Sequence, residues 1–155
     1  APGGPHQGVV GEIYAYLREQ ILLKHLGLVL TSPLDVEISE KNVLQPDVVV
    51  LLREHLEQYG ERKIQGAPDL VVEVISPGSK LYDRALKHMI YEQAGVPEYW
   101  LVDEKKQIIE LFVLERGKYQ ALGKFQGEQI LPSRIVPQMD IPVANFFDWS
   151  KGLIP

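Results

Sequence analysis

The chain has 155 residues, of which 45% are hydrophobic and 24% charged, and its formal net charge at pH 7 is −5. This composition predicts one globular domain of ordinary type, without a run approaching the roughly 18 apolar residues of a membrane span. The absence of cysteine excludes disulfides and thiolate zinc sites and permits a cytoplasmic location, and the acidic balance argues against a large non-specific nucleic-acid surface.

The N-terminal residues predict a tail followed by an amphipathic helix. Residues 1–7 are rich in proline and glycine, and we expect them to form a disordered tail ahead of a single domain at residues 8–155. Apolar residues then recur at helical spacing from Gly8 to about Leu26, and Gly27 favours a stop there. The four histidines lack the close spacing of a helical metal motif, so we expect no zinc site built from histidine.

The next segment predicts strands separated by a polar loop. Residues 34–39 alternate apolar and polar side chains, which is typical of a half-buried strand. A turn at residues 40–42 and the apolar run beginning at Asp47 favour a hairpin with that strand. Residues 53–66 are polar and charged, so we expect a mobile loop with a short helix.

The centre of the sequence predicts a buried strand followed by a helix. The run Leu70–Ile75 is apolar on both faces, as in the central strand of a covered sheet. Ser79 can cap a helix that continues to about Ala94, with Leu86, Met89 and Ile90 facing inward.

The remaining pattern completes the fold prediction. Residues 99–102 and 108–114 favour a second hairpin, residues 119–125 a further strand, and the proline-containing tail irregular structure. This order predicts an α/β or α+β domain with a mixed central β-sheet flanked by helices.

Two carboxylates stand in apolar strands. Asp47 opens one run and Glu73 interrupts the other, where an ionised carboxylate is costly without a partner. If the two strands are neighbours, both carboxylates can converge on one hard cation such as Mg²⁺ or Mn²⁺. The alternative is that Asp47 and Asp69 cap turns after proline and that Glu73 pairs with a lysine.

The following helix offers that lysine. Asp83, Lys87 and Tyr91 are spaced four apart and form one stripe. A short connection after the strand of Glu73 can bring Lys87 towards the carboxylates, where it could orient a water or neutralise a phosphate. Otherwise Asp83 and Lys87 form a surface ion pair worth only about 0.3–0.5 kcal/mol.

Together these residues resemble the Uma-two family, a branch of the PD-(D/E)XK nuclease superfamily. The most specific parts are the segments 46–50, 69–77 and 95–103, and the similarity covers roughly residues 6–125. The resemblance implies a restriction-endonuclease-like fold and a Mg²⁺-dependent or Mn²⁺-dependent endonuclease that hydrolyses phosphodiester bonds in DNA. It implies that Asp47, Glu73 and Lys87 are catalytic and that Asp47 and Glu73 bind the metal.

The sequence departs from the superfamily pattern at one position. Ile75 stands where the pattern has a lysine, and the resemblance implies that Lys87 takes over this role. Glu12, Asp69 and Tyr91 are further accessory candidates, and Glu12 sits where the superfamily often has an acidic residue. The departure leaves open a catalytically inactive nuclease-fold binding or assembly module, and hydrolysis of a small phosphorylated molecule is a third hypothesis.

Binding to DNA would need local positive charge. Basic residues flanking the motifs could contact backbone phosphates: Arg53, Arg62, Lys63, Lys80 and Arg84. A homodimer would bring two sites across a duplex and suit double-strand cleavage.

Overall fold

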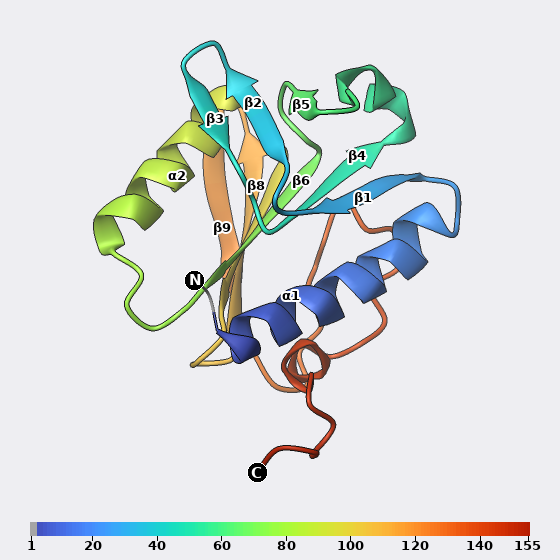
Figure 1. Ribbon diagram of the computed structural model, residues 1–155, viewed down its shortest axis with the longest axis vertical. Helices are drawn as coiled ribbons and strands as arrows, with labels where there is room; N and C mark the ends of the chain where they lie inside the picture. The colour runs from blue at the N-terminus through green and yellow to red at the C-terminus, as the bar shows by residue number, and fades with distance from the viewer. Residues whose placement is uncertain (1–2) are drawn as a thin grey trace.

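The computed structural model describes residues 3–155, which form two β-sheets with helices packed against them (Figure 1). The main sheet has six strands in the spatial order β1 (Gly27–Thr31), β4 (Val48–Leu52), β6 (Leu70–Ile75), β7 (Glu98–Asp103), β8 (Ile108–Glu115) and β9 (Lys118–Phe125). The second sheet has the order β3 (Asn42–Leu44), β2 (Asp35–Ser39) and β5 (Lys63–Gln65). The helical segments are α1 (Gly4–Leu17), η1 (Arg18–Leu22), η2 (Arg53–Gln58), α2 (Leu81–Ala94) and η3 (Val143–Phe147).

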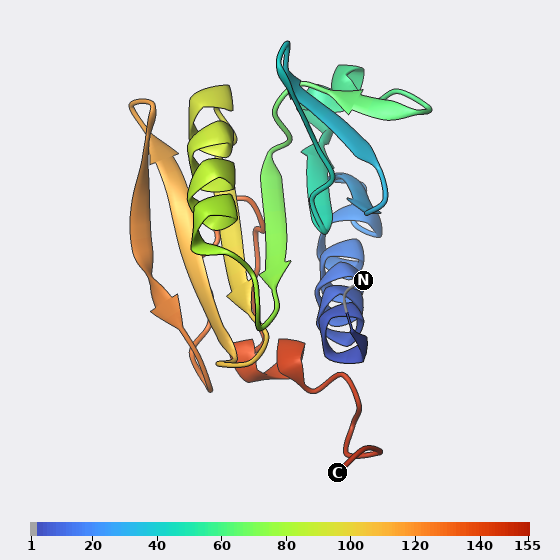
Figure 2. The same ribbon diagram turned by 60° about the vertical axis from the view of Figure 1, so that its left-hand side comes forward.

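Strand β6 lies near the centre of the main sheet. It pairs antiparallel with β4 and parallel with β7, and α2 makes the crossover between the two parallel strands. Figure 2 shows α1 and α2 on opposite faces of the sheet. The expected central strand and the mixed sheet flanked by helices are therefore confirmed. Both faces of β6 are covered, which explains why nearly every position of this strand is apolar.

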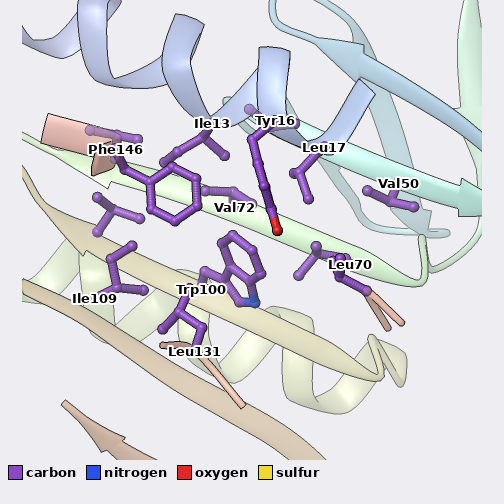
Figure 3. Packing of buried hydrophobic residues seen from close by; sticks show 14 of the residues in the cluster. Ile13, Tyr16, Leu17, Val50, Leu70, Val72, Trp100, Ile109, Leu131 and Phe146 are labelled. Carbon is purple, nitrogen blue, oxygen red and sulfur yellow. The ribbon is translucent and has the colours of Figure 1, made fainter. Parts of the chain in front are cut away.

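The larger core lies between α1, the main sheet and the C-terminal segment. Ile13 and Leu17 of α1 pack in one cluster with Val72, Trp100 and Phe146 (Figure 3). This arrangement holds α1 against the even-numbered positions of β6, so the odd-numbered positions, including Glu73, face the α2 side.

A buried carboxylate ties the C-terminal segment to the sheet. Glu98 accepts hydrogen bonds from the Trp100 indole (2.8 Å), the Ser133 hydroxyl (2.6 Å) and the Arg134 backbone N–H (2.8 Å). Each bond offsets the cost of burying this side chain. No helix within residues 3–155 is long and apolar enough to cross a membrane.

The N-terminus differs from the sequence prediction. Helix α1 begins at Gly4, so the expected disordered tail is wrong for residues 4–7, and residues 1–2 lie outside the described part. Pro5 lies in the first turn, where its missing N–H costs nothing. The expected helix to Leu26 instead ends as the π-helical turn η1, and Gly27 begins a strand whose close approach to the Leu51 carbonyl leaves no room for a Cβ.

The first hairpin was also predicted with the wrong partner. Strand β2 pairs antiparallel with β3 and parallel with β5, whereas the run after Asp47 lies between β1 and β6. Residues 48–51 are buried on both faces, so they belong inside a covered sheet rather than in an outlying hairpin. The region predicted as a mobile loop contains η2 and β5.

The second hairpin, between β7 and β8, is confirmed. Helix α2 begins at Leu81 with Lys80 as its N-cap, one residue later than expected, because the Ser79 hydroxyl bonds Ser76 rather than capping the helix. Ile90 is buried as expected, but Leu86 and Met89 are exposed.

Candidate functional site

Asp47 immediately precedes β4, and Glu73 lies in the neighbouring strand β6. The β4–β6 register pairs Val48 with Val72, and extending it by one position brings Asp47 opposite Glu73. Directly opposite residues of an antiparallel pair lie on the same face. Both side chains line one cavity of about 410 Å³ between the sheet and α2. The prediction that their strands are neighbours is therefore confirmed.

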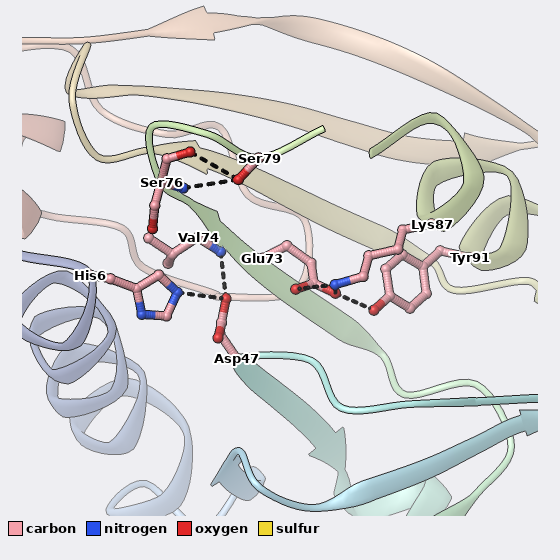
Figure 4. A network of polar contacts seen from close by, with 8 residues as sticks. All are labelled: His6, Asp47, Glu73, Val74, Ser76, Ser79, Lys87 and Tyr91. Atoms are coloured by element: carbon pink, nitrogen blue, oxygen red, sulfur yellow. Dashed lines mark hydrogen bonds and ion pairs between the residues drawn. The ribbon is translucent and has the colours of Figure 1, made fainter. Parts of the chain in front are cut away.

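Glu73 is buried and held by two side chains of α2. It is 5% exposed. The Tyr91 hydroxyl donates a 2.5 Å hydrogen bond to Oε2, and Lys87 Nζ lies 3.3 Å from both carboxylate oxygens (Figure 4). The 14-residue helix that follows β6 thus folds back over the strand and presents two positions, one turn apart, to the same carboxylate.

The surroundings of Glu73 disfavour its ionised form. Burial raises the pKa of this carboxyl, the charge of Lys87 and the Tyr91 hydrogen bond oppose that rise, and the Asp47 charge adds to it. Burial, followed by the charge of Glu73, raises the pKa of Tyr91, so its hydroxyl stays protonated and donates. A cation beside Glu73 would favour the carboxylate form.

Asp47 is held through one of its oxygens. The Val74 backbone N–H donates a 2.7 Å hydrogen bond to Oδ2, and His6 Nε2 lies 3.4 Å from the same atom. Among residues 3–155 no donor is bonded to Oδ1. Asp47 therefore has one anchored oxygen and one that is available to a ligand.

The donor set fits a hard divalent cation. Within the described range 3–155, no group of three or more His, Asp or Glu side chains is arranged to hold a metal ion. Mg²⁺ typically takes one or two carboxylates and completes its shell with water and phosphate. Asp47 and Glu73 supply that number, and the cavity leaves room for a hydrated ion.

Three cationic side chains line the same cavity: Lys80, Arg84 and Lys87. Arg84 Nε is buried and has no hydrogen-bond partner among the described residues. Ile75 also lines the cavity and brings no charge. The other basic candidates lie elsewhere: Arg53 contacts the His25 carbonyl, Lys63 pairs with Glu37, and Arg62 is exposed outside the cavity.

Of the three accessory candidates, the structure brings only Tyr91 to the carboxylates. Glu12 lines a separate hollow beside Tyr16. Asp69 immediately precedes β6 and lies four residues before Glu73, roughly 13 Å away at the usual rise per residue. It is buried, accepts a hydrogen bond from the Leu52 N–H (2.8 Å) and lies 2.7 Å from His55 Nδ1. Its contacts are therefore structural, but they join distant segments rather than capping a turn after the proline.

His6 is the site residue that the sequence analysis missed. It was assigned to a disordered tail, but α1 begins at Gly4 and places the imidazole beside Asp47. A usable signal was present, because Pro5 is well suited to a first helical turn and the apolar spacing of Val9, Val10 and Ile13 extends back towards it.

Comparisons with known proteins identify a family and a related fold. A family model, Uma2, described as "Putative restriction endonuclease", matches residues 1–144. The crystal structure of a protein described as a putative nuclease belonging to DUF820, from Anabaena variabilis ATCC 29413, superposes with a TM-score of 0.79. The two sequences are 16% identical, over 96% of this chain and 83% of that chain, so this likeness concerns the fold. No curated protein matches the sequence.

Proposed function

Because the chain belongs to the Uma2 family, whose description is putative restriction endonuclease, we propose that it is a Mg²⁺-dependent or Mn²⁺-dependent endonuclease that hydrolyses phosphodiester bonds in DNA. The observation that carries the proposal is the meeting of Asp47, Glu73 and Lys87 at one cavity. A pair of neighbouring carboxylates with an adjacent lysine is suited to phosphodiester hydrolysis assisted by a metal ion.

The proposal gives each residue a distinct task. Asp47, through Oδ1, and the carboxylate of Glu73 would hold the cation, which when bound supplies positive charge to the scissile phosphate. Tyr91 keeps Glu73 oriented through its hydroxyl. The ammonium of Lys87, 40% exposed at the cavity, donates to the attacking water and offsets the charge that develops on the phosphate.

The substrate proposal depends on local charge. Lys80 and Arg84 line the cavity beside Lys87, so they can contact phosphates on either side of the cleaved bond although the chain is acidic overall. Cleavage of both strands by a homodimer and a cytoplasmic location stay predictions.

A second candidate, a catalytically inactive nuclease-fold binding module, is favoured by one observation. Ile75 stands where the superfamily pattern has a lysine. Such a module needs the fold but not metal-dependent cleavage.

The test is cleavage of supercoiled plasmid, single-stranded DNA and RNA by the purified full chain in Mg²⁺, Mn²⁺ or chelator. We expect DNA cleavage that requires the metal and is lost in Asp47→Asn and Glu73→Gln. Glu12→Gln is the matched control, because this acid lies on α1 away from the cavity and its loss should leave cleavage unchanged. Inert wild type under every condition, or equal cleavage by all variants, would contradict the proposal.

A further inference from the structure

His6 occupies an unusual position for a histidine in the first turn of a helix. The residue is 6% exposed, and its Nε2 atom lies 3.4 Å from Asp47 Oδ2 (Figure 4). It lines the cavity of Asp47 and Glu73 and also a second hollow that borders α1 and Ser32. His6 and Asp47 together therefore form the wall between the two hollows.

The other ring nitrogen of His6 has no partner. Nδ1 is buried and makes no hydrogen bond within residues 3–155. Buried polar atoms are normally hydrogen-bonded to protein or to ordered water, so this nitrogen calls for a water molecule as its partner. A neutral imidazole that presents Nε2–H to a carboxylate keeps Nδ1 as an acceptor.

The two contacts to Asp47 Oδ2 have a joint effect on this side chain. The Val74 N–H donates to Oδ2 from the neighbouring strand, and the His6 ring of α1 lies 3.4 Å from the same atom, so groups from two different elements address one oxygen. The carboxylate is then restricted in rotation, and Oδ1 is the atom left for a ligand. Partners of this kind fix the orientation of metal-binding carboxylates.

We propose that His6 is a positioning residue of the cation site. Its Nε2 edge holds Asp47 Oδ2 in place, and its Nδ1, on the side of the ring away from Asp47, accepts a hydrogen bond from a water molecule outside the cation shell. This inference rests on the cation site of the proposed function, and it concerns the affinity for the cation rather than the cleavage step.

The chain contains a matched control for this arrangement. His55 and Asp69 form a second histidine–aspartate pair, 2.7 Å apart, at the opposite end of the β4–β6 strand pair. Neither residue lines the cavity of Asp47 and Glu73. Substitution of His55 therefore shows how the loss of a histidine–aspartate contact away from the site affects folding and metal binding.

The first experiment measures Mn²⁺ binding by calorimetry on the full chain without DNA. We expect His6→Phe, which keeps a ring without donors, to weaken Mn²⁺ binding about 10- to 100-fold, the usual loss when an orienting partner is removed. His6→Gln, which can place a side-chain N–H near Asp47, should recover much of that loss. His55→Phe should bind Mn²⁺ as wild type does, and circular dichroism confirms folding of each variant.

The second experiment uses the wild type and does not depend on the folding of His6→Phe. Imidazole ¹⁵N signals of His6 are followed during Mg²⁺ titration, and we expect a saturable shift that disappears in Asp47→Asn. Unchanged Mn²⁺ affinity in folded His6→Phe, or an unmoved His6 signal at Mg²⁺ saturation, overturns the inference.

The same data separate this inference from the proposed function. A wild type that binds Mn²⁺ tightly, weakens on His6→Phe and cleaves no DNA supports the positioning role and contradicts the nuclease activity. A wild type that cleaves DNA while His6→Phe binds Mn²⁺ normally overturns the positioning role alone. A wild type that binds no Mn²⁺ overturns both.

Discussion

The hydroxyl of Tyr91 and the carboxylate of Glu73 form a buried 2.5 Å hydrogen bond that joins α2 to the central strand β6. Tyr91 is fully buried, so its hydroxyl would have no solvent partner if the bond were lost. The bond therefore couples the packing of α2 to the charge state of the candidate site.

Removal of this hydroxyl should destabilise the protein. We expect Tyr91→Phe to lower the free energy of unfolding by about 1.5–3 kcal/mol, the range for a hydrogen bond to a charged group. Tyr82→Phe is the control on the same helix, because Tyr82 is exposed and should change stability by less than about 0.5 kcal/mol. Urea unfolding of both variants in chelator measures the difference, and equal stabilities would show that the bond adds nothing.

Neutralising Asp47 or Glu73 should affect the free energy of unfolding in the opposite direction. The raised pKa of Glu73 means that the folded state binds its proton more tightly than the unfolded state, so ionisation of Glu73 destabilises the fold once the pH exceeds the ordinary glutamate pKa. In chelator at neutral pH we expect Glu73→Gln, and likewise Asp47→Asn, to leave stability unchanged or raise it by up to about 2 kcal/mol. Thermal melts provide the measurement, and clear destabilisation by both changes would indicate structural ion pairing instead.

The pair of His55 and Asp69 predicts a pH dependence of stability. The hydrogen bond from His55 to Asp69, followed by the Asp69 charge, raises the pKa of the imidazole. The folded state therefore holds this proton more tightly than the unfolded state. The stabilisation from the His55–Asp69 pair is fully present below about pH 6.5 and is lost as the pH rises through the folded pKa of His55. The Tm advantage of wild type over His55→Gln should shrink between about pH 5.5 and pH 9. A constant difference would mean that the pair does not titrate in this range.

Two glycines of α1 should respond oppositely to alanine. A Cβ at Gly8 would overlap the Trp149 ring, whereas a Cβ at Gly11 would meet nothing within 4 Å. We expect Gly11→Ala to stabilise by up to about 1 kcal/mol through helix propensity. Gly8→Ala should destabilise by about 1–3 kcal/mol, because the ring must move. Chemical denaturation of both variants tests this, and a stabilising Gly8→Ala would place Trp149 elsewhere in solution.

Lys87 should be more important for cleavage than Lys80. Both line the cavity, but only Lys87 contacts Glu73. We expect Lys87→Ala to abolish DNA cleavage while retaining Mn²⁺ affinity, and Lys80→Ala to retain cleavage. Plasmid assays paired with calorimetry distinguish the two lysines. Loss of cleavage in Lys80→Ala alone would assign the role to Lys80.

The sequence allowed good prediction where burial alone determines the structure. The run Leu70–Ile75 is apolar at every position except Glu73, so both its central place and the exceptional residue could be recognised. The helix after it follows directly in sequence, which made the approach of Lys87 to Glu73 predictable. The proximity of Glu73 and Lys87 could therefore be predicted because the two residues lie close together in the sequence.

The missed features depend on contacts between distant segments. Periodicity could not reveal that β2 pairs with β5 rather than with the strand after Asp47, because strand partners are chosen by packing on both faces. His6 was missed because its partner lies 41 positions further along the chain, and no local pattern connects them. Asp69 follows a proline before an apolar run, as Asp47 does, and each lies beside a histidine. The structure separates the two because Asp47 lines the cavity of Glu73 and Asp69 does not.

The few buried residues of α2 divide the site into parts of unequal local stability. Asp47 borders β4 and Glu73 lies in β6, and both strands are covered on both faces. Ile90 and Tyr91 are the buried residues of α2 and lie near its C-terminal end. Opening of the first turns of α2 costs little free energy, because these turns bury little apolar surface. Amide hydrogens at residues 81–87 should then exchange with solvent much faster than those of β6. A long substrate could enter as these turns open, and their closure would return Lys87 to a pair of acids that had not moved.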